Sequence, residues 1–142
     1  MNIENQKVSI FIEVIVNADI DKVWDCWTLP ENVVNWNFAS DDWHSPCAEN
    51  DLTIGGKFSY RMEAKDGSFG FDFWGIYTNI IPKELIEITL GDERKVKVEF
   101  SEFENGIKII ESFETEDVNT AELQRNGWQA ILNNFKKYTE SK

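Results

Sequence analysis

Few side chains in this sequence combine a reactive chemical type with a position that could present it to a ligand. His44 is the only histidine, so it is the only side chain whose ordinary pKa lies close to neutral pH. At the mouth of a pocket it could hydrogen-bond a ligand or act as a base. In a simpler interpretation, His44 lies in a loop beside Trp43 and has no functional role.

Glu111 interrupts an apolar pattern. In a strand predicted over residues 107–115 it shares one face with Ile107, Ile109 and Phe113. If that face is internal, burial would raise the carboxyl pKa and suit Glu111 to donate a hydrogen bond or accept a proton. Alternatively, a one-residue bulge would return the side chain to solvent.

Arg61 and Asp72 are predicted to pair across a hairpin. A two-residue turn at Asp66–Gly67 places Arg61 directly opposite Asp72 in an antiparallel register. The pair could form the polar end of a cavity. It could equally be an exposed ion pair that contributes less than about 1 kcal/mol.

Other chemistry finds little support in the sequence. No His, Cys, Asp or Glu residues have metal-ligand spacing, and Gly55–Gly56 is a turn rather than a phosphate-binding loop, so we expect no metal and no cofactor. One histidine without a Gly-x-Ser-x-Gly motif disfavours a serine hydrolase. The 26 acidic and 14 basic residues give a formal charge of -12, which disfavours nucleic acid and anionic membranes as partners.

Length and cysteine content restrict the class of protein further. A chain of 142 residues is typical of one domain, and we expect residues 1–142 to form a single one. Residues 1–7 are polar and no long apolar run follows, so neither a targeting segment nor a membrane span is expected. Cys26 and Cys47 are too few for a disulfide framework. We therefore expect free thiols and a cytoplasmic location.

The elements that must position these residues follow from the hydrophobic periodicity. A strand is predicted over 7–16, and two short helices follow, one capped by Asp19 and the other reaching about Trp36. Five further strands are predicted at 57–64, 69–81, 84–90, 94–103 and 107–115. Tight turns at Asp66–Gly67 and Asn105–Gly106 require antiparallel pairing. The order indicates an α+β fold, a curved antiparallel sheet of about six to seven strands against a long C-terminal helix.

Aromatic residues concentrate on the faces that the sheet and the last helix would turn toward each other. The helix is capped by Asn119 or Thr120 and carries Gly127 in its interior, which indicates either close packing on the sheet or space for a bound molecule. The expected cavity walls are Trp128, Ile131 and Phe135 on the helix and Tyr60, Met62, Phe71, Phe73 and Tyr77 on the sheet.

Three segments carry a family resemblance. DLTIGGKF at 51–58, FDFWGIY at 71–77 with IPKELIE at 81–87, and GWQAILNNF at 127–135 resemble motifs of the START-like superfamily, also called SRPBCC or Bet v-like. The sequence is most similar to the branch of the activator of heat-shock-protein ATPase homologues. The resemblance covers about the whole chain and implies the helix-grip fold. Its superfamily includes lipid and hormone carriers, polyketide cyclases, hydratase-like enzymes and a co-chaperone domain.

Three functions remain open at this stage. The leading hypothesis is binding of a small hydrophobic or amphipathic ligand under the last helix, with His44, Arg61, Asp72 and Glu111 as polar candidates beside the aromatic walls. The first alternative is a cofactor-independent cyclase or hydratase that uses Glu111 or His44 as acid or base. The second is a co-chaperone-like domain, which would bind a protein partner through an exposed apolar patch.

Overall fold

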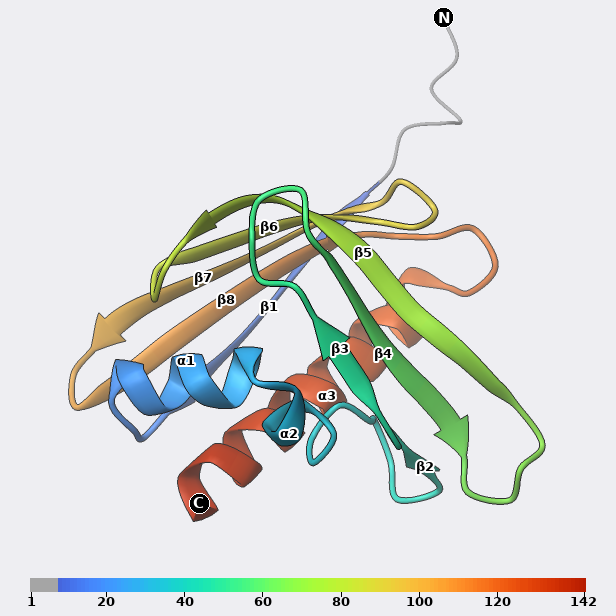
Figure 1. Cartoon of the computed structure of the whole chain (residues 1–142), viewed down its shortest axis with the longest axis horizontal. Helices are drawn as coiled ribbons and strands as arrows, with labels where there is room; N and C mark the ends of the chain where they lie inside the picture. Colours follow the sequence, from blue (N-terminus) through green and yellow to red (C-terminus); the bar gives the residue numbers. More distant parts are fainter. Residues whose placement is uncertain (1–7) are drawn as a thin grey trace, which may run out of the picture.

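A computed structural model describes residues 8–142, and the expected start of the first strand at Lys7 lies outside this range. A curled antiparallel sheet surrounds one long helix, α3, with two short helices beside it (Figure 1). The elements in chain order are β1 (Ser9–Val16), α1 (Ile20–Thr28), α2 (Pro30–Val33), β2 (Trp43–His44), β3 (Ala48–Asn50), β4 (Lys57–Ala64), β5 (Gly70–Ile81), β6 (Leu85–Leu90), β7 (Lys95–Phe103), β8 (Gly106–Glu114) and α3 (Ala121–Ser141).

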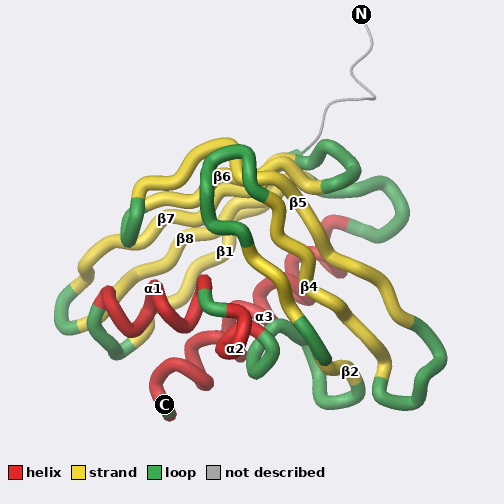
Figure 2. Tube along the Cα trace, viewed as in Figure 1, coloured by secondary structure: helices red, strands yellow, loops and turns green. Residues whose placement is uncertain are grey.

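The predicted fold class is confirmed, with two short strands more than the sequence indicated. The sheet order is β1-β8-β7-β6-β5-β4-β2, and β3 pairs with β4 beside β2. Strands β2 and β3 hold only 2 and 3 residues, too few to establish an alternating pattern. Figure 2 shows how the strands curve around α3, so that the helix lies on the concave side of the sheet.

Register decides which side chains face the concave side of the sheet. Arg61 lies opposite Asp72, as predicted, and Gly67 adopts a φ of 77° in the turn between their strands. The second turn differs by one residue from the prediction. Phe103 pairs with Gly106, so Glu104 and Asn105 form the turn. Gly106 instead begins β8, where an added Cβ would lie 2.4 Å from the carbonyl oxygen of Val16.

Side-chain caps start the two longer helices. Asp19 accepts a hydrogen bond from the backbone N–H of Lys22 at 2.9 Å, and Thr120 accepts one from that of Leu123 at 3.1 Å. The second short helix ends at Val33, before the predicted end at about Trp36. None of the helices within residues 8–142 is long and apolar enough to cross a membrane.

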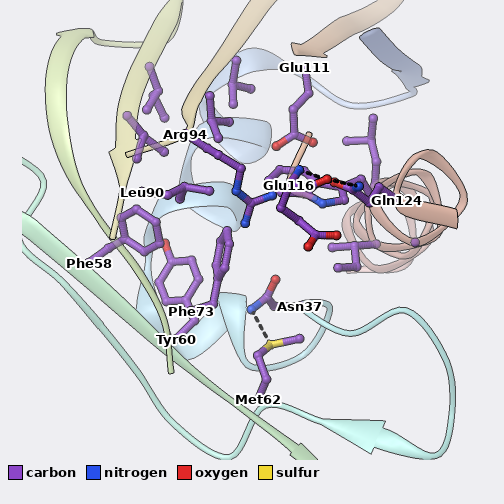
Figure 3. Close-up of a pocket in the computed structure, with 18 of the residues that line it drawn as sticks. Asn37, Phe58, Tyr60, Met62, Phe73, Leu90, Arg94, Glu111, Glu116 and Gln124 are labelled. Carbon is purple, nitrogen blue, oxygen red and sulfur yellow. Dashed lines mark hydrogen bonds between the residues drawn. The ribbon is translucent and has the colours of Figure 1, made fainter. Parts of the chain in front are cut away.

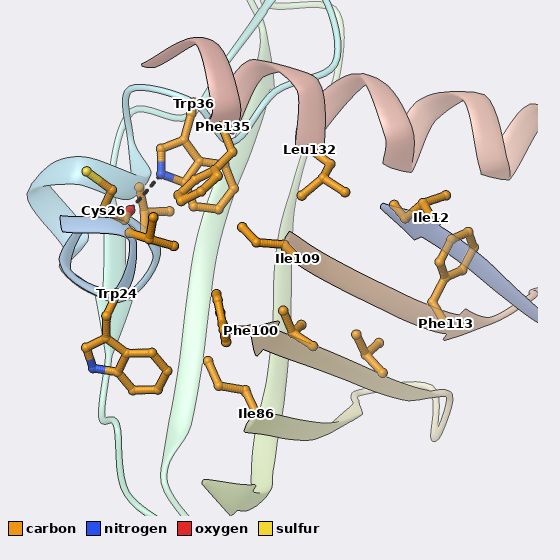
Figure 4. Close-up of a cluster of buried hydrophobic side chains, with 14 of the residues drawn as sticks. Ile12, Trp24, Cys26, Trp36, Ile86, Phe100, Ile109, Phe113, Leu132 and Phe135 are labelled. Carbon is orange, nitrogen blue, oxygen red and sulfur yellow. Dashed lines mark hydrogen bonds between the residues drawn. The ribbon is translucent and has the colours of Figure 1, made fainter. Parts of the chain in front are cut away.

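The apolar core holds the C-terminal half of α3 against the sheet and the short helices. Leu132 and Phe135 point from α3 toward Ile109 of β8 (Figure 4). Phe135 packs edge-on against Trp27 and Trp36, with ring centroids 4.9 Å apart in both pairs. This part of the helix is therefore fixed by dense packing.

Three side chains of α3 hydrogen-bond the free edge of β1. Such an edge exposes backbone carbonyls that could pair with another strand. Arg125 Nη1 donates to the carbonyl of Phe11 at 3.0 Å, Gln129 Nε2 to that of Glu13 at 3.2 Å, and Lys136 Nζ to that of Ile15 at 2.7 Å. The helix thus covers the sheet edge and the sheet face together.

Candidate functional site

A cavity of about 390 Å³ lies between the N-terminal half of α3 and the concave face of the sheet (Figure 3). An apolar cavity of about 150 Å³ already admits benzene, and small-molecule sites range from about 300 to 1,000 Å³. The space is therefore large enough for an organic molecule of two or three rings.

The cavity wall is mostly apolar and comes from α1, the long strands β4 to β8, the helix α3 and the segments between them. Its residues are Trp27, Trp36, Asn37, Phe58, Tyr60, Met62, Phe71, Phe73, Tyr77, Ile86, Ile88, Leu90, Arg94, Val96, Val98, Glu111, Glu116, Asn119, Leu123, Gln124, Gly127, Trp128, Ile131 and Leu132.

Eight of the twelve site residues expected from the sequence lie on this wall. They are Tyr60, Met62, Phe71, Phe73, Tyr77, Glu111, Trp128 and Ile131. Trp128 is held rigidly, because its ring stacks on that of Phe113 with centroids 4.1 Å apart and planes at 9°. The period of two in the strands and the helical stripe in α3 together predicted this part of the wall.

The other four expected residues lie elsewhere. Arg61 and Asp72 form an ion pair of 3.4 Å on the outer face of the sheet, and Arg61 also pairs with Glu63 at 2.8 Å. His44 lies on the same side, 3.8 Å from Glu63, with 43% of its side chain exposed. Arg61 and Asp72 alternate with wall residues along β4 and β5, so they face away from the cavity. Phe135 is fully buried in the core beyond the cavity.

Glu111 is the one carboxyl group that the sheet buries in the cavity. It lies opposite Ile12 of β1 and Val98 of β7, in uninterrupted registers that exclude the alternative of a bulge. It is 9% exposed, and burial raises its pKa from 4.5 to about 8. At neutral pH, the cavity therefore contains a protonated carboxyl group.

The loop between β8 and α3 builds a polar end of the cavity. Buried Gln124 donates to the carbonyls of Glu116 at 3.0 Å and Asn119 at 2.8 Å, and its Oε1 accepts from the backbone N–H of Glu116 at 2.9 Å. The Glu116 carboxylate accepts hydrogen bonds from the N–H groups of Val118 and Asn119, which help lower its pKa. The loop is thus held by its own hydrogen bonds.

Arg94 reaches the cavity from the turn between β6 and β7. Its Nε lies 2.8 Å from Asp92, and only 15% of its side chain is exposed. Figure 3 shows Arg94, Glu111 and Glu116 around the same part of the cavity. Arg94 therefore interacts with two carboxylates at this end, Asp92 through Nε and Glu116, whose pKa it helps lower.

Two further polar groups lie on the opposite wall. Asn37 donates from Nδ2 to the sulfur of Met62 at 3.1 Å, a weak acceptor for a buried amide. The hydroxyl of Tyr77 donates to Asn50 Oδ1 at 2.6 Å, and Asn50 in turn donates to the carbonyl of Thr28 at 2.7 Å. These bonds tie the wall of β5 to α1 through β3.

Gly127 faces open space. A Cβ added there would meet no atom within 4 Å, so close packing does not explain the glycine. Since Gly127 also lines the cavity, the alternative of space beneath the helix is the one that the structure supports.

Several wall residues were missed from the sequence. Gln124 precedes Trp128 and Ile131 by 4 and 7 positions, so the helical stripe could have revealed it. Arg94 and Asn37 lie in a turn and an irregular loop, where no periodicity predicts direction. Within residues 8–142, no three His, Cys, Asp or Glu side chains gather as a metal site would require.

Comparison with known proteins places the chain in a family. The family model described as activator of Hsp90 ATPase homolog 1-like protein matches residues 17–140. The chain belongs to this family. The resemblance expected from the three sequence segments is thereby confirmed, and with it the helix-grip fold.

Solved structures agree with this assignment. A protein from Cytophaga hutchinsonii shares 50% identity and a TM-score of 0.81 over 94% of this chain and 92% of its own. An AHSA1-like protein from Aeromonas hydrophila shares 40% identity and a TM-score of 0.89 over 94% and 93%. A protein from Chromobacterium violaceum, at 18% identity and a TM-score of 0.84 over 94% and 98%, shares the fold. No curated protein matched the chain.

Proposed function

We propose that this protein binds one small, largely apolar molecule in the cavity beneath α3. The observation that carries the proposal is a 390 Å³ space lined by aromatic and aliphatic side chains with a few polar groups at defined positions. Ligand sites in proteins have this composition. The START-like fold, whose other members include lipid and hormone carriers, is consistent with the same function.

The absence of packing at Gly127 supports a cavity that stays open for a ligand. Alanine at this helical position would be about 1 kcal/mol more favourable than glycine, and the structure has room for its methyl group. A helix optimised only for stability would carry the larger residue. Glycine keeps the space beneath the helix free.

The neutral fluorophore N-phenyl-1-naphthylamine tests the proposal, because its emission rises in apolar surroundings. We expect saturable binding at one site per chain. Gly127→Phe would fill part of the cavity and weaken binding at least tenfold, whereas the matched variant Gly127→Ala would change it less than threefold. Urea unfolding of both variants would show that each retains the fold. Unsaturable binding, or equal binding by both variants, would contradict the proposal.

Catalysis without a cofactor is a second candidate, and Glu111 is the observation that favours it. A carboxyl group with a pKa of about 8 can both give and take a proton near neutral pH. His44 lies outside the cavity, so only Glu111 of the two expected acid or base candidates is in position. Catalysis would therefore depend on Glu111 alone.

Deuterium exchange into the methyl group of 2-acetylnaphthalene would test such catalysis, since it requires proton removal next to a carbonyl. Exchange above the buffer rate in the wild type and at the buffer rate in Glu111→Gln would support an enzyme. Exchange at the buffer rate in both would leave binding as the function.

An aromatic cluster bears on possible protein partners, and the two thiols bear on location. Exposed Phe69 and Phe71 form an aromatic cluster with half-buried Trp43, with ring centroids 5.9–6.1 Å apart. Because Phe71 also lines the cavity, we interpret the cluster as the outer rim of the ligand site rather than a separate surface for a protein partner. The thiols of Cys26 and Cys47 are free, which supports a cytoplasmic location.

A further inference from the structure

We propose that Glu111 selects ligands that carry a neutral carbonyl oxygen on an otherwise apolar skeleton, by donating its carboxyl O–H to that oxygen. The inference rests on the proposed binding function and specifies the class of ligand. Apolar walls do not distinguish a ketone from a hydrocarbon of the same shape, whereas a hydrogen bond from Glu111 would.

The Glu111 carboxyl group is placed where a molecule in the cavity can reach it. Glu111 lines the cavity, and its backbone is fixed between β1 and β7 by hydrogen-bonded registers on both sides. Among residues 8–142 no side chain or backbone group contributes a hydrogen bond or a charge interaction to the shift of its pKa. The carboxyl group is therefore free to interact with a molecule in the cavity (Figure 3).

The surroundings of Glu111 favour the protonated form of its carboxyl group. The facing residues are apolar on β1 and β7, namely Ile12 and Val98, while α3 contributes uncharged Gln124 and Trp128. The other ionisable wall groups are Tyr60, Tyr77, Arg94 and Glu116. Burial raises the pKa of both tyrosines, that of Tyr77 to about 12, so they stay neutral. Arg94 is paired with Asp92, and Glu116 with backbone N–H groups.

The cavity disfavours charged ligands. An ammonium group would have to ionise Glu111 and lose its own hydration inside an apolar cavity, which costs more than the pair regains unless further hydrogen bonds form. A carboxylate would have to compete with Asp92 and Glu116, because Asp92 pairs with Arg94 and the same guanidinium helps lower the pKa of Glu116. A neutral carbonyl needs only a donor, and a protonated carboxyl group supplies one.

Four naphthalene probes of similar size test the assignment: 2-ethylnaphthalene, 2-acetylnaphthalene, 2-naphthoate and 1-(2-naphthyl)ethylamine. Their affinities are measured by displacement of N-phenyl-1-naphthylamine at pH 6, and each is divided by the affinity for the hydrocarbon 2-ethylnaphthalene. For 2-acetylnaphthalene this quotient is called the ketone ratio. This ratio cancels the contribution of the shared ring. We expect the ketone ratio to fall about 3- to 10-fold in Glu111→Leu, the range of one hydrogen bond between neutral groups.

Glu111→Gln is the matched control, because its amide N–H still donates but cannot ionise. The ketone ratio should stay within twofold of the wild type at pH 6. From pH 6 to pH 9 the wild-type ratio should fall about 3- to 10-fold as Glu111 loses its proton, while that of Glu111→Gln should stay constant.

The possible outcomes separate this inference from the proposed function. A hydrocarbon that binds, with a ketone ratio unchanged in Glu111→Leu, would overturn the role of Glu111 and leave the cavity proposal intact. A larger Glu111-dependent gain for the amine or the carboxylate would also overturn it. Failure of all probes, including the hydrocarbon, would overturn the binding function itself and the inference with it.

Discussion

Replacing Glu111 by glutamine should stabilise the fold increasingly as the pH rises. Glutamine keeps the planar shape of the side chain and does not titrate. In the wild type, the carboxyl pKa is about 8 in the folded protein against an ordinary value of 4.5 in the unfolded chain. Folding is therefore linked to the protonation of this one group.

The sign and size of the effect follow from these two pKa values. Below pH 4.5 both states hold the proton, so Glu111 leaves stability unchanged. Between pH 4.5 and about 8 the unfolded chain releases the proton and the folded protein keeps it, so the free energy of unfolding falls as the pH rises. At about 1.36 kcal/mol per pH unit, the loss from pH 5 to pH 8 is roughly 3–4 kcal/mol.

Urea unfolding followed by tryptophan fluorescence, at constant ionic strength from pH 5 to pH 8, measures this difference. We expect the stability of Glu111→Gln relative to the wild type to grow by about 3–4 kcal/mol over that interval. Glu102→Gln is the matched control, because Glu102 is exposed on β7, and its difference should stay within about 0.5 kcal/mol. A constant difference between Glu111→Gln and the wild type would refute the burial of a neutral carboxyl group.

Four further substitutions probe α3 by the same urea assay. Gly127→Ala should raise the free energy of unfolding by about 1 kcal/mol, because the added Cβ meets no atom within 4 Å; a destabilised variant would show that the cavity is not open there. Phe135→Ala should lower the free energy of unfolding by about 3–5 kcal/mol. Leu123→Ala, at a side chain 58% exposed, should lower it by less than about 1 kcal/mol. Similar losses would contradict the division of α3 into a core half and a half at the cavity mouth. Thr139→Val should stabilise the protein by about 1–2 kcal/mol, because the buried hydroxyl of Thr139 has no hydrogen-bond partner within residues 8–142, and a loss of stability would indicate that it has one.

Periodicity predicted the fold and much of the cavity wall. Alternation in β4 and β5 placed Tyr60 and Phe73 on the inner face, and the helical spacing of α3 placed Trp128 and Ile131 opposite them. Glu111 was identified for the same reason, since a polar residue in phase with an apolar face must be buried unless the strand bulges.

The errors in the expected site have two physical causes. Arg61 and Asp72 were correctly paired, but each adjoins an inner-face residue, Tyr60 or Phe73, so the same alternation turns the pair outward, on the side of His44. Phe135 continues the stripe of α3 correctly, yet sequence cannot tell where the cavity ends and dense packing begins.

The residues that sequence missed lie where chain direction depends on tertiary contacts. Arg94 and Asn37 reach the cavity from a turn and a loop. Arg94 follows the turn after β6, and Asn37 lies after α2, where it contacts Met62 of β4. No local sequence pattern predicts that these two side chains point into the cavity.

Native mass spectrometry with N-phenyl-1-naphthylamine tests the central claim most directly, because it counts molecules held per folded chain. The account predicts one adduct on the wild type and on Gly127→Ala, and its loss in Gly127→Phe, in which the new ring would occupy the space beneath α3. No adduct on the wild type at saturating fluorophore, or an adduct that persists undiminished in folded Gly127→Phe, would contradict it.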